Sequence, residues 1–437
     1  MQPESVSTKQ ERIATLARRN PAMAFTSLNQ YIDYAWVRYA YELTRKDGAV
    51  GVDGETGEDY AVDLERNLHS LVDRLKSGRY YAPPVRRHYI EKAEGGQRGL
   101  GIPCFEDKVA QRAMVMLLEP IYEQDFLDCS FGFRPNRSAH QALQTLRNAI
   151  MDQAGRWLWD VDVRKYFDSI EYPKLREFLA RRVTDGVVRR VIDKWLKAGV
   201  LEDGQRHYPE TGTPQGGVIS PLLSNIYLHY VLDEWFTDEV QSRLKGRSAL
   251  VRYCDDFVMV FEFIKDFERV QRVLGKRLER FGLQLHPDKT QLVDFRFQRP
   301  QRIEQPTPLP TTFKFLGFTH LWAKSRKGKW VVQQLMAKDC LARAVKAISD
   351  QCRQMRHESL QDQHQRLSRM LKGYFAYFGI THNGLRLERL CNMARRCWRK
   401  WLSRRSHTSY LNWVTFQRLL ERFPLPVPSI IRPYTTL

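Results

Sequence analysis

The sequence predicts a mixed α+β protein in which a sheet-containing domain is followed by a helical one. Residues 64 to 261 alternate between segments of helical and of strand-like hydrophobic spacing. Residues 336 to 405 keep helical spacing almost throughout. The composition is 43% hydrophobic and 12% aromatic, with no long low-complexity tract, which is typical of an ordered protein.

The first hundred residues are expected to hold two helices and a hairpin. Residues 8 to 45 have helical spacing and precede a glycine-rich break at 51 to 59. A second, amphipathic helix stops at Ser77-Gly78 and carries the leucines Leu64, Leu68, Leu71 and Leu75. The strand-like stretches RRHYIEK and LGIP flank the turn EGGQRG, which puts Lys92 and Arg98 on a hairpin.

The next segment alternates helices with short strands. Helical spacing from 106 to 151 is interrupted at SFGFRPNRS, and the aromatic and β-branched run WLWDVDV at 157 to 163 predicts a strand. A helical stretch is expected up to about 198, and the loop GTPQGGVISP then introduces the helix LLSNIYLHYVLDEW. The stretch VRYCDDFVMVF at 251 to 261 predicts a strand-turn-strand hairpin.

The C-terminal part is basic and helical. A proline-rich stretch at 299 to 310 predicts a connector, and residues 336 to 405 predict a helical bundle. Residues 319 to 407 contain 20 Lys and Arg against 5 Asp and Glu, so this segment is the best candidate for a nucleic-acid surface. The side chains expected to face nucleic acid lie mostly off the apolar stripe of the last helix: Arg395, Arg396, Arg399 and Lys400.

The charge and composition of the chain limit the classes of partner that it is expected to bind. A net charge of +20 and a pI near 9.7 imply a polyanion, because Lys and Arg release the counterions condensed on nucleic acid. No segment has the roughly 20 apolar residues that span a bilayer, and the N-terminus lacks an apolar signal core. We therefore expect no membrane anchor and a cytoplasmic, nucleoid-associated bacterial protein. The seven cysteines include no CxxC pair and are expected to be reduced core residues.

The strongest local signal is Tyr253-Cys254-Asp255-Asp256, in which two adjacent acids interrupt an apolar hairpin. Carboxylates between hydrophobic strands are unfavourable without cations or hydrogen bonds, so the pattern indicates either a metal site or an exposed turn. Asp162 ends the other predicted strand and is a natural partner. Three carboxylates at two turns of one sheet predict the two-metal site of a polymerase. Asp160 alternates onto the same face as Asp162, so spacing alone does not exclude it.

Seven sequence blocks then occur in one order: GLGIPCFEDKVAQRAM, SFGFRPNRSAHQAL, DVDVRKYFDSI, GTPQGGVISPLLSNIYL, YCDDFV, GLQLHPDKTQLV and KFLGF. This series resembles the reverse transcriptase blocks of group II intron proteins, over roughly residues 50 to 405. The resemblance implies a right-hand polymerase, with fingers and palm built on an antiparallel sheet, followed by an α-helical thumb or maturase domain. Its implied parts are an N-terminal extension (1–60), fingers and palm (61–320), thumb (321–405) and a short C-terminal segment without an endonuclease (406–437).

The resemblance also implies roles at the acidic site. Asp162, Asp255 and Asp256, assisted by the Val163 carbonyl, would hold two Mg²⁺ ions, with Mn²⁺ as a substitute. Lys289, in HPDKT, would protonate the leaving pyrophosphate, and a plain surface lysine is the alternative.

A nucleotide-binding set follows from the same resemblance. Lys92 and Arg98 would contact the triphosphate as charge-assisted donors, unless they are part of a solvated basic loop. Phe167, five positions after Asp162, would exclude a 2′-hydroxyl, and by itself would pass for a core aromatic. Gln215 would lie near the nascent base pair.

Further positions are implied to contact nucleic acid. Arg134 and Asn136 would line the template track or, alternatively, cap a turn. Tyr253 and Cys254 would lie beneath the primer terminus. Cys254 stands where the family commonly has alanine, which leaves open an effect on fidelity or on the primer used.

The implied activity is that of an RNA-directed DNA polymerase that takes an RNA template, a DNA primer and dNTPs. The resemblance further implies binding of structured intron RNA as a splicing maturase, and it leaves a homodimer open. One alternative is a free-standing relative that acts in DNA repair or defence. Another is a non-catalytic RNA-binding splicing factor, against which the carboxylate triad argues.

Overall fold

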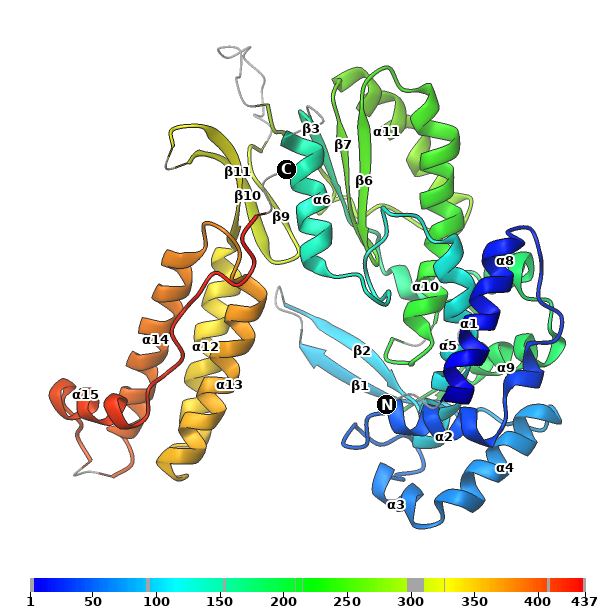
Figure 1. The fold of residues 1–437 in the computed structure, drawn as a ribbon, viewed down its shortest axis with the longest axis horizontal. Helices are drawn as coiled ribbons and strands as arrows, with labels where there is room; N and C mark the ends of the chain where they lie inside the picture. The colour runs from blue at the N-terminus through cyan, green and yellow to red at the C-terminus, as the bar shows by residue number, and fades with distance from the viewer. Residues whose placement is uncertain are drawn as a thin grey trace. The chain divides into compact units, whose positions relative to one another are not determined.

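Helices alternate with antiparallel strands along the chain, which confirms the α+β class (Figure 1). The computed structural model describes residues 4–91, 95–151, 155–208, 210–213, 215–296, 310–325, 327–406 and 409–434. The chain forms two units. Unit 1 comprises Met1–Ala142 and Trp159–Gln291, and unit 2 comprises Leu143–Leu158 and Leu292–Leu437.

The N-terminal region of unit 1 is divided into more helices than its hydrophobic periodicity predicts. The single helix expected over 8 to 45 is wrong: α1 (Glu4–Arg19), the 3₁₀ turn η1 (Leu28–Tyr31) and α2 (Tyr34–Leu43) replace it. Pro21 disfavours helix at the residue before it, and the Asp33 carboxylate accepts a hydrogen bond from the Trp36 amide to begin α2. Helices α3 (Gly57–Val62) and α4 (Leu64–Lys76) follow, and α4 ends at Ser77-Gly78 as predicted.

A four-stranded sheet with the order β2-β1-β4-β5 carries the predicted basic hairpin. Strands β1 (Val85–Glu91) and β2 (Gln97–Ile102) are antiparallel, and β1 pairs in parallel with β4 (Val200–Glu202). The hairpin of β4 and β5 (Gln205–His207) was not anticipated. Its turn, Asp203-Gly204, has positive φ at both residues and is a recognisable two-residue hairpin signal.

A second four-stranded sheet, with the order β6-β7-β3-β8, carries the acidic motif. Strands β6 (Ser248–Tyr253) and β7 (Asp256–Phe261) form the predicted hairpin, beside β3 (Trp157–Val161) and β8 (Gln291–Asp294). Strand β7 is buried from Phe257 to Phe261, so it belongs to the hydrophobic core rather than to a surface.

Helices surround these strands in the order expected. Helix α5 (Phe105–Asp125) and α6 (Ala139–Met151) flank the interruption at SFGFRPNRS. The stretch up to 198 is divided into α7 (Tyr166–Ser169), α8 (Tyr172–Arg182) and α9 (Gly186–Lys197). Helix α10 (Ser220–Leu228) continues in π-helical turns, η2 (His229–Asp233) and η3 (Trp235–Val240), with the short turn η4 (Gln241–Arg243) after them, and α11 (Ile264–Glu279) follows β7.

Unit 2 contains a small sheet and the predicted helical bundle. Strands β9 (Phe313–Phe315), β10 (Phe318–Lys324) and β11 (Trp330–Met336) are antiparallel, and α12 (Lys338–Gln354), α13 (Leu360–Phe378), α14 (Gly384–Leu402) and α15 (Trp413–Arg422) follow. The domain boundary expected between residues 320 and 321 would lie inside β10. The expected connector lies, except for Pro310, outside the described residues.

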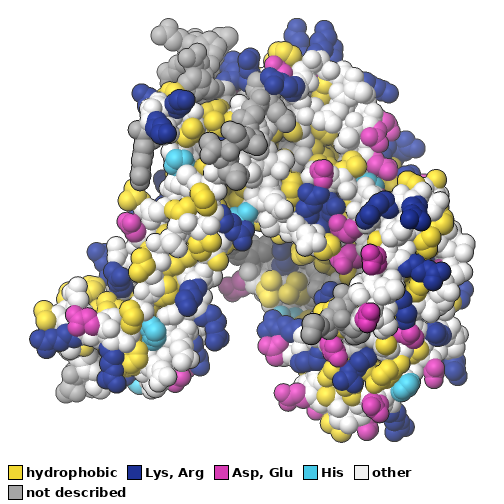
Figure 2. All heavy atoms as spheres, viewed as in Figure 1, with side chains coloured by type: hydrophobic (Ala, Val, Ile, Leu, Met, Phe, Trp, Pro, Cys, Tyr) yellow, Lys and Arg dark blue, Asp and Glu magenta, His cyan; other side chains and the backbone are white. Residues whose placement is uncertain are grey.

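The surface of the bundle is basic and its centre is apolar. Lys and Arg side chains are spread over the helices of unit 2 in Figure 2, with few Asp and Glu among them. The predicted stripe of α14 is buried at Leu387, Leu390, Ala394 and Trp398. All seven cysteines are free, as predicted, but only four of them are buried core residues, because Cys129, Cys340 and Cys397 are half-buried. In the described part of the chain, no helix has both the length and the apolar character needed to cross a bilayer.

Candidate active site

The acidic motif forms the tip of the β6–β7 hairpin. Tyr253 pairs with Asp256, which leaves Cys254 and Asp255 as a two-residue loop. Cys254 has φ of +60°, and its side chain is only 4% exposed, with its Sγ 3.7 Å from the Ser224 Oγ. Burial raises the pKa of the Cys254 thiol to about 12. The expected contact between this side chain and the primer is therefore not supported, because the thiol faces the core.

Asp256 lies in a concentration of negative charge. Its pKa is raised to about 7, chiefly through desolvation by surrounding protein atoms, although the residue keeps exposed surface. The neighbouring carboxylates of Asp255, Asp162 and Asp160 also contribute to this raised pKa, and Lys289 partly offsets them. Because β3 lies beside β7 in the sheet, the predicted acids come within electrostatic range of one another.

The position of Asp160 clarifies an ambiguity of the sequence. Its Oδ2 accepts a hydrogen bond of 3.1 Å from the Gln291 side chain. Burial, together with the charge of Asp162, raises the pKa of Asp160 to about 6. Asp160 is thus a fourth carboxylate of the cluster, with a protein partner of its own.

The segment after α11 holds Asp162 from one side. The Asp162 carbonyl accepts a hydrogen bond of 2.8 Å from the His286 amide, and Val163 forms an isolated bridge with Leu285. These contacts bring the Lys289 Nζ to 3.8 Å from the Asp162 Oδ2, with both side chains partly exposed. Lys289 therefore belongs to the acidic site in space as well as in sequence.

The donor set suits a hard cation held by few protein ligands. Among the described residues, no group of three or more His, Cys, Asp or Glu side chains is arranged to hold a single ion. Mg²⁺ is commonly bound through one or two carboxylates, with waters and substrate phosphates completing its octahedron. The oxygen-only chemistry of Asp162, Asp255 and Asp256, and the unfavourable accumulation of charge at Asp256, fit that mode of binding.

The loop after β5 joins two predicted nucleotide-binding elements. The Thr213 amide donates to the Phe167 carbonyl at 2.8 Å, and Gly212, with φ of +94°, leaves no room for a Cβ, which would lie 2.9 Å from the same carbonyl oxygen. At its other side, the Gly101 amide of β2 donates to the Gln215 carbonyl at 2.6 Å. The backbone thus brings Phe167, Gln215 and strand β2 together.

Of the residues predicted to bind the nucleotide, those that the structure describes have solvent-accessible side chains. Phe167 is partly exposed, and its ring meets that of buried Tyr166 edge-on at 5.3 Å. Arg98 is exposed on β2. Lys92 lies outside the described residues.

Arg134 is buried rather than displayed to a template. Its side chain pairs with Glu123 at 3.0 Å and donates to the carbonyls of Leu127 and Ser130, each at 2.8 Å. With 7% exposure and these partners, Arg134 anchors its loop, so the expected template contact gives way to the structural alternative. Asn136 is exposed, with φ of +59°.

An exposed aromatic pair lies beside the acidic turn. Phe133 is 58% exposed, has φ of +56°, and its ring centroid is 6.5 Å from that of Tyr253. The sequence prediction included Tyr253 but missed Phe133. An apolar residue between Gly132 and Arg134 offered no signal that its ring would be left outside the core.

The basic residues predicted on α14 divide into two kinds. Arg396 and Lys400 are exposed. Arg399 lies over the Trp413 ring at 4.3 Å and donates to the Leu411 carbonyl at 2.7 Å, so it also holds the segment before α15. Arg395 is half-buried and donates to Asn392.

The chain is similar in sequence to several known proteins. The family described as "Reverse transcriptase (RNA-dependent DNA polymerase)" matches residues 90–320. "Protein YkfC" of Escherichia coli (strain K12) is 35% identical over 323 residues, which are 66% of this chain and 84% of that protein. "Group II intron-encoded protein LtrA" of Lactococcus lactis subsp. cremoris is 39% identical over 224 residues. This match spans 50% of the present chain but only 37% of LtrA.

Among solved structures, telomerase from Candida albicans in complex with a fragment of telomeric RNA covers 85% of this chain and 69% of its own. The identity is 12% and the TM-score 0.41, a similarity too distant to carry an argument.

Proposed function

The chain belongs to the reverse transcriptase (RNA-dependent DNA polymerase) family, and on that premise we propose that it extends a DNA primer with dNTPs along an RNA template. The observation that carries the proposal is the convergence of Asp162, Asp255 and Asp256. They lie at the ends of neighbouring strands of one sheet, and burial, together with the charge of the first two, raises the pKa of the third.

We propose that Asp162, Asp255 and Asp256, with the Val163 carbonyl, hold two Mg²⁺ ions, for which Mn²⁺ can substitute. When bound, the two ions supply the positive charge that favours ionisation of the primer 3′-hydroxyl and neutralises the triphosphate. Lys289 lies 3.8 Å from Asp162, which supports a role in donating a proton to the leaving pyrophosphate.

The nucleotide would be bound by the elements that the loop after β5 joins. Phe167 is partly exposed beside that loop, which supports a steric gate against a 2′-hydroxyl. Gln215 would contact the nascent base pair, and Arg98, with Lys92 of the same hairpin, would neutralise the triphosphate. Tyr253 and exposed Asn136 would contact the nucleic-acid strands around the acidic turn.

We further propose that the protein binds structured intron RNA, a proposal supported by its similarity to a group II intron-encoded protein. The charge of +15 over residues 319 to 407 supports an RNA surface that includes Arg396 and Lys400. A free-standing polymerase for repair or defence shares the catalytic proposal and differs only in its template. Preferential binding of a cognate intron over other structured RNAs of equal length would favour the maturase.

Primer extension on an RNA template with Mg²⁺ tests the catalytic proposal. Asp255→Asn should reduce extension to background while template-primer binding, measured by fluorescence anisotropy, stays within about threefold, because the change removes one charge from a partly exposed turn. Asp168→Asn is the matched control. It alters an exposed carboxylate six positions after Asp162 and should leave extension intact.

The outcomes separate the functional classes. If Asp255→Asn extends the primer as the wild type does, the metal assignment is wrong. If the wild type binds RNA but extends no primer with Mg²⁺ or Mn²⁺, the non-catalytic splicing factor is the correct class.

A further inference from the structure

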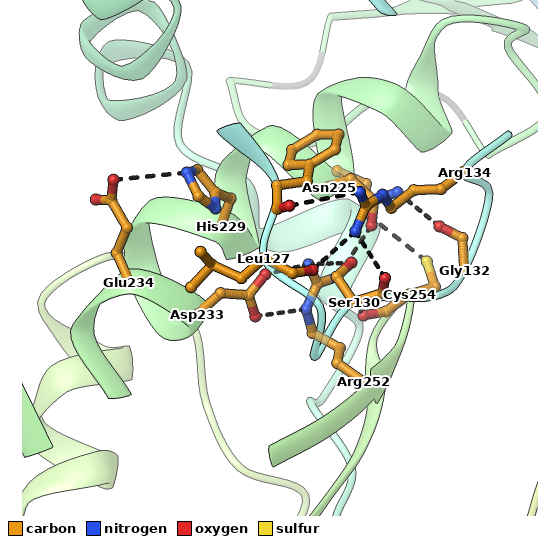
Figure 3. Close-up of polar contacts among 12 residues, drawn as sticks. Leu127, Ser130, Gly132, Arg134, Asn225, His229, Asp233, Glu234, Arg252 and Cys254 are labelled. Carbon is orange, nitrogen blue, oxygen red and sulfur yellow. Dashed lines mark hydrogen bonds and ion pairs between the residues drawn. The ribbon is translucent and has the colours of Figure 1, made fainter. Parts of the chain in front are cut away.

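A fully buried arginine lies directly behind the acidic turn. Arg252, the residue before Tyr253, has no exposed surface, and neither has its partner Asp233 of η2. Figure 3 shows this pair beside Ser130 and Cys254. A buried ion pair gains little stability over apolar residues of the same shape, so its presence next to an active site calls for another explanation.

All five N–H groups of the Arg252 guanidinium have acceptors. Nε and one terminal nitrogen, Nη2, bind the two oxygens of Asp233, and Nη2 also donates to the Ser130 hydroxyl at 2.8 Å. The other terminal nitrogen, Nη1, donates to the Asn225 side chain at 2.9 Å and to the Cys254 carbonyl at 3.0 Å. The planar guanidinium therefore ties the loop at Ser130 and the helical segment from α10 to η2 to the carbonyl of Cys254, the residue that precedes Asp255.

The turn is held from its other face by the same network. Asn225 donates from its side-chain nitrogen to the Gly132 carbonyl at 2.7 Å, and a Cβ on Gly132 would lie 2.5 Å from the Cys254 amide nitrogen. The backbone of Arg252 is fixed as well, through hydrogen bonds with Cys129 and Phe131. Cys254 is thus enclosed between the Arg252 fork and the loop at Gly132.

The enclosure maintains an unfavourable backbone conformation. A residue other than glycine at positive φ is in an unfavourable conformation, which persists only where the surrounding structure enforces it. Cys254, at +60°, is such a residue, and Arg252 holds its carbonyl. Its conformation directs the backbone that carries Asp255 and Asp256.

We propose that Arg252, held by Asp233 and Asn225, is a positioning residue for polymerisation, which keeps the Cys254 carbonyl fixed so that Asp255 and Asp256 stay aligned. It touches no reacting group and acts through the backbone of the turn. The inference rests on the proposed polymerase activity. It goes beyond that proposal by assigning a task to three buried residues, one of them on the strand that carries the acids and two on the helical segment from α10 to η2.

Two variants separate this positioning role from a contribution to folding alone. Arg252→Lys keeps a positive charge beside Asp233. However, a single ammonium group cannot bind Asp233 and also donate the hydrogen bond that the guanidinium makes to the Cys254 carbonyl. The pair Arg252→Met with Asp233→Leu removes both charges together, which avoids leaving a buried carboxylate unpaired. Both variants withdraw the hydrogen bond from Cys254.

The measurement is steady-state primer extension as a function of dNTP and Mg²⁺ concentration, with thermal unfolding measured alongside. We expect kcat to fall by roughly 10- to 100-fold in both variants, since misplacement of reacting groups by about 1 Å has effects of that order. We also expect more Mg²⁺ to be needed for half-maximal rate, with little change in the KM for dNTP. A merely structural role would lower the melting temperature and leave both the Mg²⁺ dependence and kcat of the folded fraction unchanged.

A second Arg–Asp pair in unit 1, with Arg182 buried and Asp125 half-buried, is the matched control. Arg182 lies 2.9 Å from Asp125 and donates to the carbonyls of Ala17 and Asn20, at the end of α1. Arg182→Met with Asp125→Leu should change the melting temperature without changing kcat at saturating template-primer, or the amount of Mg²⁺ required.

The possible outcomes are distinct. A wild type that extends no primer would refute the proposed function. If the wild type is active and the folded Arg252→Lys and double variants match it in kcat and Mg²⁺ dependence, the positioning role is wrong. Should the double variant fail to fold, Arg252→Lys decides alone, because its charge remains paired.

Discussion

At the scale of single residues, the active site combines exposed reactive groups with buried groups that hold them. Asp162, Asp255 and Lys289 are partly exposed, whereas Arg134, Arg252 and Cys254 are buried beneath the loops that they support. The exposed set resembles what the motifs predict. The buried set became apparent only from its contacts.

Phe167 is the residue whose role is most directly testable. Phe167→Ala should raise incorporation of rNTPs relative to dNTPs by on the order of 10- to 100-fold, because removing the ring opens space for a 2′-hydroxyl. Single-nucleotide extension with each substrate gives the ratio of the two kcat/KM values. Tyr166→Phe is the neighbouring control, since it removes only a hydroxyl that donates to the Ser224 carbonyl. Unchanged discrimination in Phe167→Ala would refute the gate.

Asp107 should make stability depend on pH. Burial raises its pKa to about 7, and the Tyr80 hydroxyl donates to it. Because the pKa is higher in the folded than in the unfolded chain, the folded state binds the extra proton between about pH 4 and 7. The contribution of Asp107 to the free energy of unfolding is fully present below pH 4 and is lost as the pH rises through 7.

Asp107→Asn removes that ionisation while keeping an acceptor for Tyr80. Relative to the wild type, the variant should become steadily more stable as the pH is raised from 4.5 to 7.5, as measured by urea unfolding. A difference that stays constant over this range would contradict the assigned pKa.

At the scale of elements, the loop after β5 connects the parts of unit 1 that we propose bind the nucleotide. It is hydrogen-bonded to α7 through the Phe167 carbonyl and to β2 through the Gly101 amide. Neither contact involves a side chain, so the loop depends on glycines where the backbones approach closely. Gly216, with φ of +116°, would carry a Cβ 2.7 Å from the Gly101 carbonyl oxygen.

Gly212→Ala tests this arrangement. The added methyl would lie 2.9 Å from the backbone at Phe167 and Asp168, so the loop must move away from α7. We expect the KM for dNTP to rise by on the order of 10- to 100-fold, with template-primer affinity retained. Gly204→Ala is the matched control, because Gly204 also has positive φ, at +79°, but nothing lies within 4 Å of its Cβ position. Equal kinetic effects in both variants would attribute the result to backbone strain alone.

At the scale of the whole molecule, charge is divided unevenly along the chain. The segment from 319 to 407 carries +15 of the net +20, and the acidic cluster lies in unit 1. Binding of a polyanion and the chemistry of nucleotide transfer are therefore expected to respond to different substitutions. Salt dependence distinguishes the two, because it reports the number of phosphates that are neutralised.

Arg396→Gln with Lys400→Gln should reduce the slope of log affinity for RNA against log salt by about 1.4 to 1.8, if both exposed side chains contact phosphate. The kcat at saturating template-primer should be unchanged. Filter binding from 50 to 300 mM salt provides the slope. Arg399→Gln is the contrasting variant. It should lower the melting temperature, because Arg399 holds Trp413 and the Leu411 carbonyl. An unaltered slope in the double variant would remove α14 from the RNA surface.

Local sequence patterns were sufficient to predict most of the helices and strands. Hydrophobic periodicity predicted α4, β3, the β6–β7 hairpin and the bundle of α12 to α14, since the apolar faces of these elements repeat with the period of their own backbone. The same signals failed over 8 to 45, where Pro21 and the Asp33 cap interrupt a stretch that keeps helical spacing. The β4–β5 hairpin was missed although its Asp203-Gly204 turn could have revealed it.

By itself, the sequence determined the class of the protein, because the seven ordered blocks carry it, and it predicted which acids form the proposed metal site. The tertiary structure decided what the buried polar side chains do. It turned Arg134 from a template contact into an anchor, directed the Cys254 thiol into the core, and joined Arg252 to Asp233, Asn225 and Ser130. The physical reason is that the role of a buried hydrogen-bond donor depends on which residue supplies its acceptor. Ser130 lies 122 positions from Arg252, and only packing brings the two together.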